Sequence, residues 1–330
     1  MNRRKFGRTG FEISAVSYGG IVSMDDGQSA SDRYVSWAID RGVNYFDVAP
    51  SYGDAQEKLG NSLKPYRSRV HLACKTGQRM RAEAEKELEG SLKLLHTDHF
   101  DVYQLHGIAS MQEVETAFGP GGVMELMREL KEKGVAANIG ITAHSEDAAL
   151  RALELYDFDT VLFPFNWFMN MEHGMGSRLI QAAKARNMGV LCMKAFIERK
   201  WESDEERKAS AFPKSWCKPI DVADVRFGEA AMKYALSLGV DTLIPPGNYA
   251  SFSFAVDHID ECLKHPLNDA DRRFLEEKLT QVRGKEFFLF PSARPQPPAR
   301  LAGETLPAGG GQLFPMKSLD NSRRSFYNEE

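Results

Sequence analysis

The chain has 330 residues, 42% of them hydrophobic, which is enough to bury the core of one large α/β domain or two ordinary ones. It has 42 Lys and Arg and 46 Asp and Glu, which gives a formal net charge of −4. This charge provides no general attraction to nucleic acid or anionic membranes. No stretch approaches the ~18 apolar residues of a membrane span. We therefore expect a cytoplasmic protein without nucleic-acid or membrane partners. Composition does not indicate its oligomeric state.

The four cysteines, Cys74, Cys192, Cys217 and Cys262, lie far apart and form no C-x-x-C pair. This spacing argues against a zinc site or a redox dithiol and suits a reducing compartment. The N-terminal residues 1–6 resemble a twin-arginine export signal, but no apolar segment of ~7–15 residues follows them. We interpret them as part of the mature fold.

Eight short apolar runs alternate with amphipathic stretches along the chain. The expected strands are residues 15–18, 44–48, 71–75, 100–105, 138–142, 160–165, 190–193 and 242–244. The expected helices are residues 30–41, 55–63, 81–95, 122–133, 147–155, 178–187 and 223–238, with an additional helix at 269–283. Strand followed by helix eight times predicts a parallel sheet closed into a (β/α)8 TIM barrel of ~250 residues.

The residues left over predict three additions to the barrel. Residues 4–14 read as a β-hairpin that covers one mouth. A long loop after the seventh strand, residues 197–220, carries Trp201 and Trp216, and long loops at the C-terminal face of a barrel shape ligand sites. We expect residues 1–290 to form the barrel and residues 291–330 a tail that drapes over it or is partly disordered.

An open doubly wound sheet is the alternative fold. If such a sheet bound a dinucleotide, a G-x-G-x-x-G turn would normally follow its first strand. The turn at Tyr18, Gly19 and Gly20 lacks that pattern, which favours the barrel.

Polar residues end three consecutive predicted strands: Asp47, Lys75 and His106. The ends of neighbouring barrel strands meet at one rim, so these side chains should converge, with Tyr52 in the loop above them. Singly, each is most often a cap, a solvated charge or a structural group, but four complementary groups at the catalytic face of a barrel favour an active site. A metal site is the competing use of Asp47 and His106, but the sequence offers no second His at ligand spacing, so we expect no metal.

The chemistry of such a cluster is proton transfer. If the Lys75 ammonium lies within ~4–6 Å of the Tyr52 hydroxyl, its charge favours the phenolate and should lower a pKa that starts near 10. Asp47 would keep Lys75 charged, and His106 would hydrogen-bond a substrate oxygen. This arrangement suits protonation of a carbonyl oxygen whose carbon accepts hydride.

These residues resemble the aldo-keto reductase family. The resemblance extends over about residues 4–261 and rests on residues 6–14, the specific signature of residues 42–60, and residues 101–106. It implies that Tyr52 is the general acid/base, that Lys75 and Asp47 tune it, and that His106 positions the carbonyl. It also implies that NADP or NAD lies across the barrel mouth and exchanges hydride with an aldehyde, ketone or sugar.

The resemblance further implies where the ligands bind. Cofactor would contact Gly19, Gly20, Thr142, Asn166, Met193, Lys194, Phe196, Gly247, Asn248, Ser253 and Asp257. Substrate would contact Ile21, Trp167 and Phe168. Ala143 and Leu162 stand where the family often has an Asn and a Gln for the nicotinamide carboxamide. An iron-sulfur cluster, found in one branch, is not expected because no cysteine follows Cys262.

The largest departure from the family is the cofactor loop, residues 244–257, which contains no Lys or Arg. Members selective for NADPH usually bind its 2′-phosphate there with a cationic side chain, since a dianion needs charged donors. We therefore expect a weakened preference for NADP and possible use of NAD. Two other functions stay open: a non-catalytic barrel that senses nicotinamide cofactor, and an aldolase-like barrel with Lys75 as a Schiff-base amine.

Overall fold

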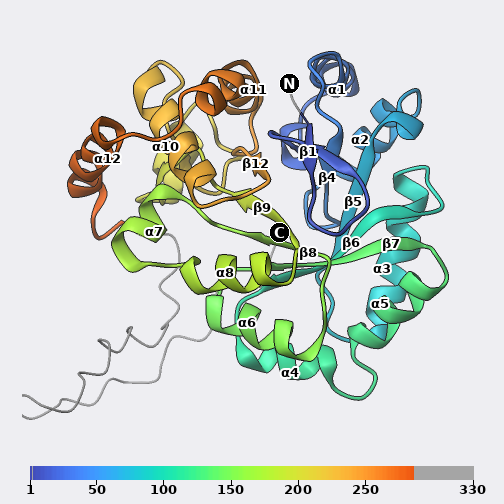
Figure 1. Cartoon of the computed structure of the whole chain (residues 1–330). Coiled ribbons are helices and arrows are strands. Elements are labelled where there is room, and N and C mark those ends of the chain that lie inside the picture. The colour runs from blue at the N-terminus through green and yellow to red at the C-terminus, as the bar shows by residue number, and fades with distance from the viewer. Residues whose placement is uncertain (2, 286–330) are drawn as a thin grey trace, which may run out of the picture. The chain divides into compact units, whose positions relative to one another are not determined.

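The computed structural model describes Met1 and residues 3–285, so the predicted tail of residues 291–330 lies outside the described residues. Eight parallel strands form one sheet and follow one another in chain order around it (Figure 1). They are β3 (Tyr18–Gly19), β4 (Tyr45–Asp47), β5 (His71–Thr76), β6 (Phe100–Ile108), β7 (Ala136–Ala143), β8 (Thr160–Phe163), β9 (Gly189–Met193) and β12 (Thr242–Ile244). A parallel bridge between Val16 and Leu243 joins the two ends, which confirms the predicted (β/α)8 barrel.

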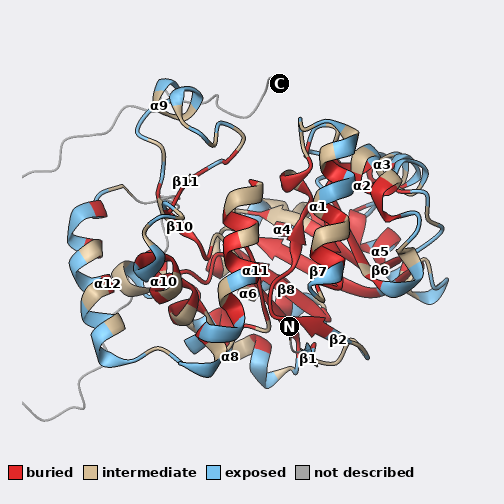
Figure 2. Cartoon of the chain, turned by 90° about the horizontal axis from the view of Figure 1, so that it is seen from above, coloured by how far each residue is buried: buried red, intermediate tan, exposed pale blue. Residues whose placement is uncertain are grey.

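Helices surround the sheet and turn their buried faces toward the strands (Figure 2). Those that match a predicted helix to within two residues at each end are α1 (Gln28–Asp40), α2 (Ala55–Leu63), α3 (Arg81–Leu94), α5 (Val123–Glu132), α6 (Glu146–Leu155), α8 (Ser177–Ala185), α10 (Val225–Ser237) and α12 (Asp269–Val282). Two single turns of 3-10 helix are η1 (Gly20–Val22) and η2 (Arg67–Arg69). In the described part of the chain, no helix has the length and apolarity needed to cross a bilayer.

Four α-helices were not predicted: α4 (Met111–Phe118), α7 (Trp167–His173), the short α9 (Asp204–Ala209) and α11 (Tyr249–Lys264). The treatment of residues 244–257 as a loop was therefore wrong for its second half. The first turns of α11 are rich in aromatic residues and serine, which have modest helix propensity. The helix nevertheless begins here because the Asn248 side chain accepts the backbone N–H of Ser251 at 2.7 Å and caps it.

The apolar core has two parts. A large one fills the space between the sheet and the helices. A small one fills the barrel itself, and its buried members are Phe6, Ile13, Tyr45, Ala73, Val102, Leu162, Leu191 and Ile244. Since Phe6 and Ile13 come from the N-terminal residues, the segment before the first barrel strand is a structural plug.

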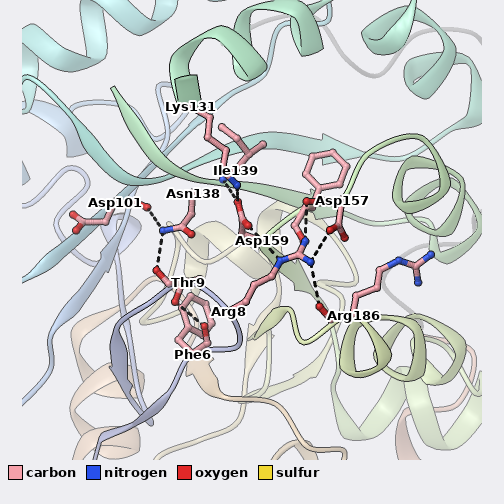
Figure 3. Close-up of polar contacts among 11 residues, drawn as sticks. Phe6, Arg8, Thr9, Asp101, Lys131, Asn138, Ile139, Asp157, Asp159 and Arg186 are labelled. Atoms are coloured by element: carbon pink, nitrogen blue, oxygen red, sulfur yellow. Dashed lines mark hydrogen bonds and ion pairs between the residues drawn. The ribbon is translucent and has the colours of Figure 1, made fainter. Parts of the chain in front are cut away.

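That plug is held by a polar network at the N-terminal mouth (Figure 3). The hairpin consists of β1 (Arg3–Lys5) and β2 (Glu12–Ser14), paired antiparallel. At its turn, Arg8 donates to Asp157 Oδ2 at 2.7 Å and to the carbonyls of Asp157 and Phe158 at 2.8 and 2.7 Å. The hairpin thus covers the N-terminal mouth, and the C-terminal mouth remains for a ligand site.

The loop after β9 folds over the other end of the barrel. It contains β10 (Ile197–Arg199), α9 (Asp204–Ala209) and β11 (Lys218–Pro219), and β10 pairs with β11. Seen from above, these elements lie on the side opposite β1 and β2 (Figure 2).

Candidate active site

A pocket opens where the barrel strands end on the side of the β9 loop. It has a volume of about 770 Å³, counting the solvent at its mouth. Residues from the predicted catalytic, cofactor and substrate sets share its wall: Gly19, Ile21, Asp47, Tyr52, Lys75, His106, Thr142, Met193, Lys194 and Gly247. Polar groups and an apolar wall in one concave site are typical of a small-molecule site.

The four predicted catalytic side chains meet in this pocket. Lys75 Nζ donates to the Tyr52 hydroxyl at 3.4 Å and to the Val48 carbonyl at 3.3 Å. It also forms an ion pair with Asp47, and both partners are almost fully buried. The Tyr52 and His106 rings are 5.9 Å apart, nearly perpendicular. The strand ends therefore bring an ammonium, a phenol and an imidazole to one rim.

The expectation that Lys75 lowers the pKa of Tyr52 below its ordinary value was wrong in its net direction. Burial raises the pKa of Tyr52 and outweighs the opposing effect of the Lys75 charge. Burial alone would lower the pKa of Lys75, but the charge of Asp47, with a contribution from Tyr52, raises it. Tyr52 is thus a neutral phenol and Lys75 an ammonium at neutral pH, the states that a proton donor and its electrostatic support require.

His106 is held as a neutral imidazole. Burial, reinforced by the charges of Lys75 and Arg79, lowers its pKa to about 3. The backbone here is fixed from two sides, because Arg79 donates to the His106 carbonyl at 2.8 Å and the N–H of Gly107 donates to Thr142 Oγ1 at 2.7 Å.

Among Met1 and residues 3–285, no group of three or more His, Cys, Asp or Glu side chains is arranged to hold a metal ion.

The β9 loop supplies a wall that is fastened to the opposite side of the pocket. Lys214 donates to the carbonyls of Val22 and Met24 at 3.0 and 2.8 Å and pairs with Asp26 at 2.9 Å. Two residues later, the indole of Trp216 lies edge-on to the Tyr52 ring, 5.6 Å between centroids, and is 50% exposed. The loop therefore places an apolar surface beside the phenol at the pocket mouth.

The donor set at the pocket fits a dinucleotide. Helix α11 begins directly after pocket residues 245–247, and the N-terminus of a 16-residue helix attracts phosphate. Lys194 and Lys214 add two amines to the same wall; burial lowers the pKa of Lys194, and Lys214 is paired with Asp26. Gly247 lets this turn pack against η1, since a Cβ there would lie 2.1 Å from Ile21 Cγ2. Outside the pocket wall, Asn166 Nδ2 and Ser251 Oγ, in the first turn of α11, are buried without a hydrogen-bond partner among the described residues.

Several predicted ligand residues lie elsewhere. Trp167 and Phe168, expected to contact substrate, are fully buried in the core, where Trp167 Nε1 donates to the Ile197 carbonyl at 2.9 Å. The reason is that β8 ends at Phe163, so Trp167 begins α7 and faces the helical layer. Phe196 is likewise buried and packs on Phe254.

The remaining cofactor candidates have structural partners. Asn248 caps α11, and Ser253 Oγ donates to the Ala250 carbonyl at 3.1 Å. Asp257 pairs with Arg41 at 3.2 Å. Gly20 begins η1 and, with Gly19, leads the chain out of the first barrel strand; only Gly19 of the two is part of the pocket wall.

The structure also adds residues that the sequence argument left without a role. His144, Ser215, Cys217 and Pro246 line the pocket. Gln104 lies beneath it, where its Nε2 donates to Asp47 Oδ2 at 2.6 Å. A signal for Gln104 was present, because a polar residue two positions before His106 shares its face of the strand.

Comparisons with known proteins agree with this site. The model of the aldo/keto reductase family matches residues 20–247. The aldo-keto reductase YhdN of Bacillus subtilis (strain 168) is 26% identical over 330 aligned positions, 86% of this chain and 96% of that protein. L-galactose dehydrogenase of Arabidopsis thaliana is 29% identical over 160 positions, 42% of this chain and 47% of that protein.

Solved structures share the fold. The aldo-keto reductase AKR11C1 from Bacillus halodurans, in its holo form, superposes with a TM-score of 0.63 at 20% identity, covering 84% of this chain and 96% of that one. A putative aldo-keto reductase from Pseudomonas aeruginosa superposes with a TM-score of 0.60 at 21% identity, covering 78% of this chain and 95% of that one. Because the family model spans well over half of the sequence, including the rim residues described above, the chain belongs to the aldo/keto reductase family.

Proposed function

We propose that this protein transfers hydride between a nicotinamide cofactor and the carbonyl carbon of an aldehyde, ketone or sugar, with Tyr52 as the general acid/base. The observation that carries the proposal is the 3.4 Å hydrogen bond from Lys75 to the Tyr52 hydroxyl in a pocket that also contains His106. Family membership supports an oxidoreductase that acts on carbonyl compounds.

Each residue has one task in carbonyl reduction. The bound nicotinamide supplies the hydride. Tyr52 donates its proton to the carbonyl oxygen, and Lys75 stabilises the phenolate that remains. His106, being neutral, donates one N–H to the same oxygen and orients it without adding a second charge. In alcohol oxidation the proton returns to Tyr52.

Reduction and oxidation should depend on pH differently. Because burial raises the pKa of Tyr52 above its ordinary value of 10.0, the phenol stays protonated throughout neutral pH. We expect kcat/KM for reduction to be flat from about pH 6 to 9, whereas kcat/KM for oxidation, which needs the phenolate, rises across that interval. Initial rates in both directions measure this. A reduction rate that falls with a midpoint near pH 7 would contradict the assignment.

The cofactor would lie between the start of α11 and the β9 loop, with Lys194 and Lys214 near its phosphates. The first turns of α11 offer no cationic side chain for a 2′-phosphate, and Arg41, the cation that α11 contacts through Asp257, is already paired. We therefore propose that NADP is not strongly preferred over NAD.

Fluorescence titration with NADH and NADPH tests this preference. We expect dissociation constants within about tenfold of each other, since a 2′-phosphate without a charged partner gains little. Exchanging Ser253 for Arg should improve binding of NADPH alone. A preference of the unmodified protein for NADPH above about a hundredfold would refute the proposal.

The Lys214 tether should control cofactor release. In Lys214→Met, the loop loses its contacts with two carbonyls and with Asp26. We expect cofactor to dissociate about tenfold faster in stopped-flow measurements, with little change in melting temperature, because the lost contacts fasten a loop and leave the barrel itself unchanged. Lys218→Met, which removes a cation from the same loop that pairs with Glu198, is the matched control and should leave the dissociation rate unchanged. Equal rates in all three proteins would show that the tether does not retain cofactor.

The pocket mouth favours a substrate with an apolar face. The Trp216 indole can stack on a sugar ring or on an aromatic group next to the carbonyl. A relative is named for a sugar, L-galactose dehydrogenase, which favours testing sugars first. The direct test is a screen of aldehydes, ketones and sugars with both cofactors, followed by absorbance of reduced nicotinamide. Absence of turnover with every class would favour the cofactor-binding, non-catalytic alternative.

A further inference from the structure

The Lys75–Asp47 ion pair in the pocket wall has a third hydrogen-bonding partner, Gln104. Its Nε2 donates to Asp47 Oδ2 at 2.6 Å, while the other carboxylate oxygen, Oδ1, pairs with Lys75. All three side chains are buried, with residue exposures of 0 to 2%. Both oxygens of Asp47 therefore accept hydrogen bonds, one from Lys75 on the adjacent strand β5 and one from Gln104 on β6.

The barrel architecture makes this contact possible. Layers inside a TIM barrel are built from alternate strands, and Asp47 on β4 and Gln104 on β6 are separated by one strand. Gln104 is the register partner of Lys75 on β5. It lies two residues before His106, so both point into the barrel, with Gln104 one layer deeper.

Space for Gln104 comes from Gly140, its register partner on β7. A Cβ at Gly140 would lie 2.3 Å from Thr160 Oγ1 and 2.9 Å from Gln104 Cγ. Any side chain at this position would thus displace the glutamine that reaches Asp47.

The hydrogen-bond inventory shows what the amide contributes. Facing a carboxylate, Gln104 must present its N–H, and its own Oε1 is left buried without a partner among the described residues. A leucine would fill similar volume without burying an unpaired oxygen. What only the amide supplies is a charge-assisted hydrogen bond that fixes the orientation of Asp47 toward Lys75.

We infer that Gln104 is a positioning residue for the reaction: it holds Asp47 so that the Lys75 ammonium stays charged and in contact with the Tyr52 hydroxyl. It touches neither substrate nor cofactor. This inference rests on the proposed function, and its effect should appear in the pH dependence and in kcat rather than in cofactor affinity.

The first test is Gln104→Leu. Without this hydrogen bond Asp47 is no longer held against Lys75, and burial then favours loss of the Lys75 proton. We expect kcat for reduction to fall about tenfold, and the basic limb of the pH profile to move to lower pH by about one unit. The dissociation constant for NADH, measured by tryptophan fluorescence, should stay within about threefold.

Gln104→Glu separates positioning from packing, because the two side chains have the same shape. A protonated carboxyl can donate to Asp47, but an ionised one repels it, and two buried carboxylates in contact do not both ionise readily. We expect near-normal kcat at acidic pH and a steep fall in kcat as pH rises. The fall should occur at a lower pH than in Gln104→Leu. This variant also decides the question if the leucine variant does not fold.

Gln56→Leu is the matched control. Gln56 is another buried amide, whose Nε2 donates to Ser91 Oγ at 2.8 Å and to Cys74 Sγ at 3.4 Å, and none of these three residues lines the pocket. It should lower the melting temperature without moving the pH profile. The inference fails if Gln104→Leu and Gln104→Glu both keep the pH profile of the unmodified protein while Tyr52→Phe is inactive. If Tyr52→Phe itself stays active, the proposed function fails instead.

Discussion

Replacing Tyr52 by Phe should abolish nearly all turnover while cofactor still binds. The substitution removes the hydroxyl that contacts Lys75 in the pocket and that delivers the proton to the carbonyl oxygen in the proposed mechanism. A general acid contributes about a hundred- to ten-thousandfold to the rate. We expect kcat to fall by about a thousandfold, and the NADH dissociation constant to change by less than about threefold.

Tyr45→Phe is the matched control for that experiment. Tyr45 is also fully buried in the barrel, two residues before Asp47, and its hydroxyl has no hydrogen-bond partner among the described residues. Loss of this hydroxyl should leave kcat unchanged. Retention of more than about a tenth of the activity in Tyr52→Phe would exclude Tyr52 as the general acid and reopen the aldolase-like and sensor alternatives.

Removing one partner of the Lys75–Asp47 ion pair should lower the stability of the fold more than replacing both partners. In Lys75→Met, Asp47 stays buried and keeps its hydrogen bond from Gln104, but the carboxylate loses its counter-charge. We expect the free energy of unfolding to fall by about 3–5 kcal/mol, measured by urea denaturation. The double variant Lys75→Met/Asp47→Leu should recover most of that loss, because no buried charge remains. Both variants should be inactive.

A surface ion pair provides the reference for this measurement. Arg151 and Glu154 pair at 2.7 Å, but their side chains are 49% and 61% exposed. Arg151→Met should change the free energy of unfolding by less than about 1 kcal/mol. If the double variant is less stable than Lys75→Met, the pair itself stabilises the fold and the penalty of an unpaired charge is not the cause.

The sequence by itself determined the barrel and the rim residues. Alternating apolar runs and amphipathic stretches are local patterns, and eight repeats allow few closed arrangements. The position of Asp47, Lys75 and His106 at strand ends follows from the same pattern, since parallel strands end on one side. Even α4 carried a local signal, because Ser110 and Glu113 form a capping box at its start.

Only the tertiary structure decided the environment of each group. Trp167 and Phe168 follow a strand, as pocket residues do, yet they face the helical layer because β8 ends early. The pKa of Tyr52 is raised although Lys75 is in contact, because the hydroxyl is buried by the whole fold around it. The sequence indicates a nearby charge such as Lys75 but not the extent of burial. The contacts of Gln104 with Asp47 and of Lys214 with η1 join residues far apart in the chain, and barrel closure alone brings them within reach.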